Sequence, residues 1–229
     1  KKIFPEARVI RMDADTTSNK GAHEDIINRF KNHEYDILLG TQMISKGLNF
    51  PLVTLVGVIN ADATLNIPDF RSGERTFSLL SQVSGRAGRN ELPGEVILQT
   101  FNPDNFTLKC VQENDYMKFY KYEMSNRHKL DYPPYYFLTS IKIASKDYDL
   151  ASKEILKVRK YLESNLNKDT IILGPTTASM FKMNNIYRFQ IILKYKKDPN
   201  IMKTLKELDE LYMLNNKVNI EIDNNPLQV

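Results

Sequence analysis

The sequence is poor in cysteine and has no long hydrophobic run. Cys110 is the only cysteine among the 229 residues, so an internal disulfide and a zinc site within this chain are both excluded. Its apolar, helix-like surroundings favour a core position, and such sparse use of cysteine indicates a reducing, cytoplasmic compartment. No apolar stretch approaches the roughly 20 residues that cross a bilayer, so we expect no association with a membrane.

Three other features are absent or weak. The chain has no Gly-x-x-x-x-Gly-Lys-Ser/Thr phosphate loop, so we expect that it does not hydrolyse ATP by itself. Its first residues, Lys1 to Pro5, resemble neither a signal peptide nor a natural start, which predicts a fragment of a longer protein. The net charge of +4 is a mild excess that permits nucleic-acid binding through local basic patches without requiring it.

The amino-terminal part of the chain alternates between short apolar runs and helical patterns. Strands are predicted at residues 7–12, 35–39, 53–59 and 95–100, and helices over residues 21–32 and from about Ser72. This alternation predicts an α/β domain with a parallel sheet and flanking helices. Ligands of such sheets sit beyond the carboxyl ends of the strands, where polar residues such as Asp62 cluster in this sequence.

The second predicted strand ends in Gly40-Thr41-Gln42, and Lys46 and Gly47 follow closely. The Thr41 hydroxyl and the backbone N–H groups of such a turn can bind a phosphate diester, and Lys46 adds positive charge. Thr41 is equally suited to cap a following helix, which is a common arrangement in α/β proteins. The local sequence leaves both interpretations open.

The densest group of anion-binding residues is Gln82-Val83-Ser84-Gly85-Arg86-Ala87-Gly88-Arg89. The guanidinium groups of Arg86 and Arg89 match phosphate oxygens, and glycine lets the backbone approach a ligand closely. The pattern predicts contact with a nucleotide phosphate. A helix end with a glycine cap and ordinary surface arginines is the alternative.

Residues 105–136 are predicted to connect two domains. A single helical stretch rich in Tyr and Phe leads to Tyr132-Pro133-Pro134-Tyr135, where two prolines fix a rigid bend. Its aromatic residues could stack on bases, but their helical spacing favours a seam packed between domains. The predicted domains are therefore residues 1–104 and 137–229, with this connector between them.

The carboxyl-terminal part shows clean periodicities. Strands are predicted at residues 137–143, 170–173, 187–193 and 218–222, and helical stripes at residues 151–162 and 201–212. The order βαββαβ predicts an α+β ferredoxin-like domain. Lys182 and Arg188 belong to a basic segment after Gly174-Pro175, which suits DNA through backbone contacts and stacking. Solvated lysines on a small domain would produce the same pattern.

Taken together, the motifs resemble the second motor lobe of superfamily 2 helicases. They are Asp-x-Asp-Thr-Thr from Asp13, Gly-Thr-Gln-Met-x-x-Lys-Gly from Gly40, Asn-Ala-Asp from Asn60, Pro-Asp-Phe-Arg from Pro68 and Gly-Arg-Ala-Gly-Arg from Gly85. Residues 68–77 and 132–135 resemble, more narrowly, the bacterial replication-restart helicases. This resemblance covers nearly the whole chain. It implies a RecA-like second lobe followed by the small ferredoxin-like domain of that family.

The resemblance also implies roles for individual residues. Arg86 and Arg89 would reach the phosphates of ATP with Mg²⁺, which an absent first lobe holds, and one of them, with Arg89 favoured, would be an arginine finger. The remaining predicted nucleotide-binding residues are Gln82, Gly85, Gly47, Asn49 and Asp62, and the predicted DNA-binding residues are Thr41, Gln42, Lys46, Lys182 and Arg188. Asn49 stands where the family usually has an acidic residue, so hydrogen-bonding groups remain but the charge is lost.

As a whole, the resemblance implies the carboxyl-terminal half of an ATP-dependent DNA helicase acting in replication restart and primosome assembly. The expected partners are forked or single-stranded DNA, single-strand-binding proteins and primosome proteins, and we expect a monomer. Zinc is expected only in the upstream region. A different superfamily 2 motor, such as a fork-reversal or RNA helicase, is one rival, against which residues 68–77 and 132–135 argue. A non-catalytic docking platform is the other rival.

Overall fold

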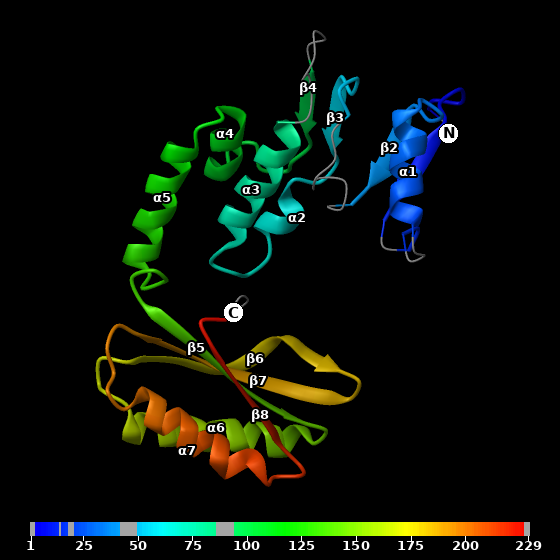
Figure 1. The fold of residues 1–229 in the computed structure, drawn as a ribbon. Coiled ribbons are helices and arrows are strands. Elements are labelled where there is room, and N and C mark those ends of the chain that lie inside the picture. Colours follow the sequence, from blue (N-terminus) through cyan, green and yellow to red (C-terminus); the bar gives the residue numbers. More distant parts are fainter. Residues whose placement is uncertain (1–2, 14, 18–20, 42–49, 86–93, 227–229) are drawn as a thin grey trace. The chain divides into compact units, whose positions relative to one another are not determined.

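A computed structural model describes residues 3–13, 15–17, 21–41, 50–85 and 94–226. The contacts within the chain divide it into two compact units (Figure 1). The first unit comprises Lys1–Ile67 and Arg71–Phe119, and the second comprises Pro68–Phe70 and Tyr120–Val229. This division falls inside the predicted connector, and it assigns the short segment Pro68–Phe70 to the second unit.

The first unit is built from parallel strands and helices. Its elements are β1 (Val9–Met12), α1 (Ala22–Lys31), β2 (Ile37–Gly40), β3 (Leu55–Val58), α2 (Asp62–Leu65), α3 (Ser72–Ser84), β4 (Glu95–Leu98), α4 (Phe106–Gln112) and the start of α5 (Tyr116–Lys129). β1 pairs in parallel with β2, and β3 pairs in parallel with β4. Parallel pairing confirms the predicted α/β class. Over the described residues the strands form two separate two-stranded sheets, and the short helix α2 was not predicted.

The predicted single helix of the connector is wrong, because the described chain forms α4 and α5 with a break between them. Asn114 has a φ of 53°, a left-handed conformation that interrupts a helix. The N–H of Asp115 then donates to the carbonyl oxygen of Cys110 at 3.0 Å. The Asp115 side chain accepts a 2.8 Å hydrogen bond from the N–H of Lys118, which caps the new helix.

An aromatic contact joins α3 to α5. The rings of Phe77 and Phe119 stack with centroids 4.5 Å apart, and both side chains are buried. Cys110 lies fully buried in the same cluster, which confirms its predicted core position, and burial raises the pKa of its thiol. Of the aromatic residues in the predicted seam, Phe119 is therefore packed in a core, whereas Tyr120 and Tyr122 are 44% exposed.

The second unit contains one antiparallel sheet with two helices. Its elements after the remainder of α5 are β5 (Phe137–Ser145), α6 (Tyr148–Asn165), β6 (Ile171–Met183), β7 (Ile186–Tyr195), α7 (Ile201–Met213) and β8 (Asn219–Asn224). The strand order is β6-β7-β5-β8, and neighbouring strands of this sheet pair antiparallel. The βαββαβ order with the first and third strands in the centre is the ferredoxin-like fold, as predicted.

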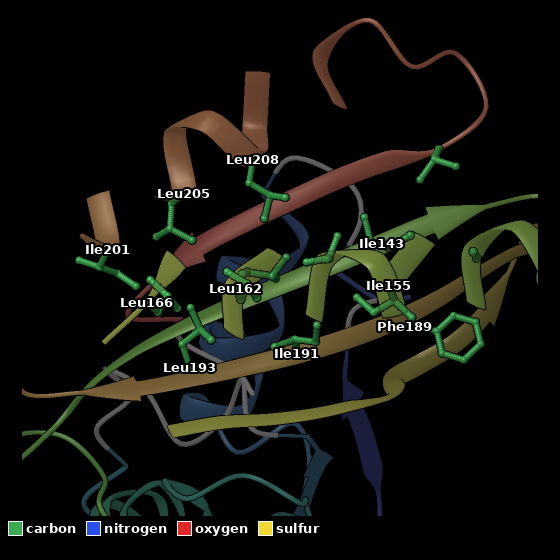
Figure 2. Packing of buried hydrophobic residues seen from close by; sticks show 14 residues of the cluster. Ile143, Ile155, Leu162, Leu166, Phe189, Ile191, Leu193, Ile201, Leu205 and Leu208 are labelled. Carbon is green, nitrogen blue, oxygen red and sulfur yellow. The ribbon is translucent and has the colours of Figure 1, made fainter. Parts of the chain in front are cut away.

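Both helices cover one face of this sheet, and the core lies between them. Figure 2 shows Ile143, Ile191 and Leu193 of the strands meeting Leu162 and Leu208 of the helices. Each of these side chains is at most 1% exposed. Burying one such side chain stabilises the fold by about 1.5–3 kcal/mol, so the alternating strands and helical stripes fix this layer.

β6 is longer than the strand predicted at residues 170–173, because Gly174 and Pro175 lie within it at a bulge. Gly174 has a φ of +96°, and a Cβ atom there would lie 2.8 Å from the carbonyl oxygen of Gln190. Beyond the bulge the strand runs on to a two-residue hairpin of Asn184 and Asn185, whose φ angles are 52° and 59°. β6 therefore occupies most of the segment between the strands predicted at residues 170–173 and 187–193.

Candidate nucleotide and nucleic-acid interface

The carboxyl ends of β1 and β2 lie side by side, because Met12 pairs in register with Gly40. Thr41 follows Gly40 at this edge and is exposed. Asp13 follows β1 directly, and Asp15, Thr16 and Thr17 lie in a turn beyond it. Asp13 and Thr41, which come from two different sequence motifs, therefore lie at the same edge of the sheet, as the predicted parallel pairing requires.

Hydrogen bonds hold the turn after β1. The N–H of Asp13 donates to Oγ1 of Thr16 at 2.8 Å, and the N–H of Thr16 donates to Oδ1 of Asp13 at 3.0 Å. The Thr17 hydroxyl donates to the carbonyl oxygen of Asp13 at 2.7 Å. The N–H of Thr16 and the Arg11 guanidinium lower the pKa of the Asp13 carboxyl, so this turn keeps a negative charge. The sequence motif gave no role for Asp13, and the structure assigns it the organisation of the strand end.

Asp62 begins α2 beyond the end of β3 and is 7% exposed. Its Oδ1 accepts a 2.7 Å hydrogen bond from the Thr100 hydroxyl, and its Oδ2 accepts a 2.8 Å hydrogen bond from the N–H of Phe101. Its own N–H donates to Oδ1 of Asn60 at 3.1 Å. The carboxylate therefore ties α2 to the chain that leaves β4. Its predicted contact with a nucleotide stays a prediction.

Gln82 and Gly85 lie at the carboxyl end of α3. Gln82 is exposed, and its Nε2 atom lies 3.5 Å from Oγ of Ser78 on the same helix. Gly85 ends the helix, and its N–H donates to the carbonyl oxygen of Ser81 at 3.1 Å. Its φ of −73° suits any residue, and an added Cβ would meet only ordinary contacts from 3.5 Å. Helix capping thus explains where Gly85 lies, but it does not explain why the residue is glycine.

Six predicted site residues lie outside the described part of the chain. They are Gln42, Lys46, Gly47, Asn49, Arg86 and Arg89. Their roles stay predictions, and the structure describes only the residues that lead into them, Thr41 and Gly85. Over the described ranges, no group of three or more His, Cys, Asp or Glu side chains is arranged to hold a metal ion. Within those same ranges, no helix combines the length and apolar character that crossing a bilayer requires.

Lys182 and Arg188 flank the β6–β7 hairpin on opposite faces of the sheet. Lys182 pairs across the strands with Tyr187, its Nζ lying 3.0 Å from the Tyr187 hydroxyl and 4.7 Å from the ring centroid. Tyr187 shares the helix-covered face with Phe189, so Arg188 between them points to the other face. The predicted basic segment therefore does not present these two side chains on one face, because Arg188 is next to Tyr187, the residue that pairs with Lys182.

The helix-free face holds a basic residue that the sequence reasoning missed. Lys142 of β5 pairs with Gln190 of β7 and so lies on the same face as Arg188. Its Nζ lies 3.0 Å from Oε1 of Glu221. The alternation of β5 was visible in the sequence, but the register that places Lys142 near Arg188 was not. Arg188 itself donates to the carbonyl oxygen of Ile186 at 3.4 Å and is half-buried.

Two family models match separate parts of the chain. Residues 1–91 match the helicase conserved C-terminal domain, and residues 128–227 match the primosomal protein N C-terminal domain. The fold and the matches define the class of protein: a helicase carboxyl-terminal lobe joined to the carboxyl-terminal domain of a primosomal protein.

Curated relatives match along nearly the whole chain. Replication restart protein PriA of Bacillus subtilis (strain 168) is 48% identical over 228 residues, covering 98% of this chain and 28% of the relative. PriA of Synechocystis sp. is 40% identical over 227 residues, covering 99% of this chain and 27% of the relative. PriA of Chlamydia trachomatis is 37% identical over 230 residues, covering 99% of this chain and 30% of the relative. The chain is similar to the carboxyl-terminal part of these PriA proteins and spans less than a third of their length, and the matches confirm the predicted resemblance.

Proposed function

We propose that this chain supplies the second motor lobe and the carboxyl-terminal domain of an ATP-dependent DNA helicase that acts in replication restart and primosome assembly at forked DNA. The observation that carries this proposal is the register of β1 and β2, which brings Asp13, Thr16 and Thr41 to one sheet edge. The exposed Thr41 hydroxyl at this edge fits an oxygen of a phosphate diester, while the hydrogen bonds of Asp13 and Thr16 hold the neighbouring turn in place. The similarity of the chain to PriA proteins supports the same function.

On the nucleotide side, Arg86 and Arg89 follow α3 and contact the phosphates of ATP with Mg²⁺, which an upstream lobe holds. An arginine at the γ-phosphate stabilises the charge that develops during phosphoryl transfer. Gln82, Gly85, Gly47 and Asn49 contribute to the same interface, where an exposed Gln82 is free of packing constraints. Asp62 acts there by fixing the strand end, because its two oxygens already accept hydrogen bonds.

On the DNA side, Thr41, Gln42 and Lys46 hold the backbone of one strand. Lys182 and Arg188 contact DNA at the β6–β7 hairpin, one from each face, so the hairpin is inserted between DNA segments. Nucleotide binding closes the two lobes and hydrolysis releases them, which moves this lobe along the strand. This chain alone hydrolyses no ATP, since it has no phosphate loop.

We place the whole protein in the cytoplasm as a monomer. Its partners are forked or single-stranded DNA, single-strand-binding proteins and primosome proteins. Zinc belongs to a part of the whole protein upstream of this chain, because Cys110 is the only cysteine here and is buried in the core.

The decisive variant is Arg89→Ala in the intact protein. Loss of a finger arginine is expected to lower DNA-stimulated ATPase turnover by about a thousandfold or more while the protein stays folded. Lys203→Ala, which removes a cation whose side chain is 79% exposed on α7, is the control and should turn over normally. Unchanged turnover in Arg89→Ala would remove the proposed nucleotide role.

A further inference from the structure

The loop between α2 and α3 contributes Pro68–Phe70 to the second unit, although Ile67 before it and Arg71 after it belong to the first. Phe70 lies only two residues before the start of α3 at Ser72. The start of a helix in the first unit is thus covalently tied to residues that pack within the second.

Phe70 belongs to a column of four side chains, here named the Phe70 stack: Arg127, Phe70, Tyr132 and Lys194. The rings of Phe70 and Tyr132 stack with centroids 4.8 Å apart and an interplanar angle of 11°. The Arg127 guanidinium lies 5.1 Å from the Phe70 centroid, and Nζ of Lys194 lies 3.6 Å from the Tyr132 centroid. A cation at each end of two stacked rings is a favourable arrangement, because the ring faces carry negative potential.

Both cations of the Phe70 stack are anchored by further contacts. Nε of Arg127 donates to Oε1 of Glu123 at 2.9 Å, and these side chains are only 12% and 16% exposed. Lys194 is 6% exposed, and its Nζ donates to the carbonyl oxygen of Leu130 at 2.9 Å. A buried ammonium needs such partners, so Lys194 fixes the end of the connector against β7. The stack is therefore a rigid feature of the second unit.

α3 extends from this anchored loop to the arginine motif. It runs from Ser72 to Ser84, a rigid element of roughly 20 Å at 1.5 Å per residue, and Phe77 and Leu80 bury one of its faces. Gly85, the residue before Arg86, ends it. A rigid helix of this length can carry a displacement of the loop at Phe70 to its other end at Gly85.

We infer that the Phe70 stack is a positioning device through which the carboxyl-terminal domain controls the placement of α3 and hence of Arg86 and Arg89. Phe70 and Tyr132 are positioning residues, since they act through the helix. The inference rests on the proposed function, because it needs these arginines to contact the nucleotide. DNA bound to the second unit then stimulates ATP hydrolysis and changes ATP affinity through the stack, and ATP changes DNA affinity by the same factor as DNA changes ATP affinity.

The test compares Phe70→Leu with Phe70→Tyr in the intact protein. Leucine keeps an apolar side chain but removes the ring, whereas tyrosine preserves the stack. We expect Phe70→Leu to lower the ratio of DNA-stimulated to DNA-free ATPase about tenfold, with the rate and the KM for ATP measured without DNA within about twofold, and Phe70→Tyr to retain the ratio. Phe101→Leu, which alters a side chain that is 93% exposed, is the matched control and should change nothing.

A second readout is the affinity for fork DNA with and without a non-hydrolysable ATP analogue and Mg²⁺. Phe70→Leu should bring the two dissociation constants together, because coupling is reciprocal. Tyr132→Leu should reproduce the effect, and the double variant should lose no more than either single one, since both remove the same interaction. Tyr132→Leu replaces Phe70→Leu in every measurement if the latter does not fold.

Two outcomes separate this inference from the proposed function. An unchanged stimulation ratio in folded Phe70→Leu and Tyr132→Leu would overturn the positioning role, as would an equal loss in Phe70→Tyr. Retained ATPase in Arg89→Ala would instead overturn the nucleotide role of the arginine motif, whatever the Phe70 variants do.

Discussion

The hydroxyl of Thr100 donates a 2.7 Å hydrogen bond to the buried carboxylate of Asp62, although 38 residues separate them. The bond connects the start of α2 with the chain that leaves β4, and so closes the carboxyl edge of the β3–β4 pair. A polar residue at a strand end is compatible with ligand binding and with internal support of that edge. The hydrogen bonds of Asp62 assign it at least the second role.

Asp62→Ala is therefore expected to destabilise the first unit. The substitution removes the hydrogen bonds from the Thr100 hydroxyl and the Phe101 N–H, and each such bond contributes about 0.5–1.5 kcal/mol to the free energy of unfolding. Urea denaturation would measure the loss. Asp25→Ala, at an α1 side chain that is 66% exposed, is the control and should change stability by less than about 0.5 kcal/mol. Equal stability of both variants would contradict the supporting role.

Gly174→Ala should destabilise the second unit more strongly than a comparable change in the first. Alanine is strained at a φ of +96°, and its Cβ would lie 2.8 Å from the carbonyl oxygen of Gln190. We expect a loss of about 2–4 kcal/mol in the free energy of unfolding. Gly57→Ala is the matched control, since a Cβ at Gly57 meets nothing within 4 Å. Thermal unfolding of the two variants would decide, and a stable Gly174→Ala would show that the bulge of β6 can shift.

Acid should weaken the fold through the pair of Arg8 and Asp36. Nε of Arg8 donates to Oδ2 of Asp36 at 3.0 Å, and Nη2 of Arg8 donates to Oδ1 at 2.8 Å. These hydrogen bonds lower the pKa of Asp36 from 3.8 to about 2. Because the folded-state pKa is the lower one, the pair stabilises the fold above about pH 3.8, and this contribution is lost as the pH falls through about 2. Denaturation curves between these values should show a shallower pH dependence in Asp36→Asn than in the parent protein. Identical slopes would indicate that the exposed pair is fully screened.

The sequence predicted those features that depend on local periodicity. The alternation of Phe189, Ile191 and Leu193 and the stripes of α6 and α7 identified the ferredoxin-like layer, because each pattern reports one buried face. The polar strand ends at Asp13 and Thr41 were likewise visible, since parallel strands place their carboxyl ends together.

The sequence did not predict features that depend on register or on contacts between distant segments. Asn114 separates α4 from α5 because its backbone is left-handed. The residues around it have a helical pattern, so the sequence did not indicate this break. The opposite orientations of Lys182 and Arg188 follow from a pairing register with bulges in β6. The stacking of Phe70 on Tyr132 joins segments with no common periodicity, so only the folded chain reveals it.

The opposite orientations of Lys182 and Arg188 lead to a test of DNA binding at the β6–β7 hairpin. If DNA segments lie on both sides of the hairpin, Lys182→Ala and Arg188→Ala should each lower the slope of log affinity against log salt by about 1 for fork DNA, and the double variant by about 2. Lys203→Ala is the control. An effect of Arg188→Ala alone would place DNA on the helix-free face, because of these two residues Arg188 is the one on that face. Every phosphate contact releases counterions, so DNA binding through this domain must weaken as salt is raised. If the parent protein instead shows negligible, salt-insensitive DNA binding but still binds primosome proteins, this domain is a docking platform.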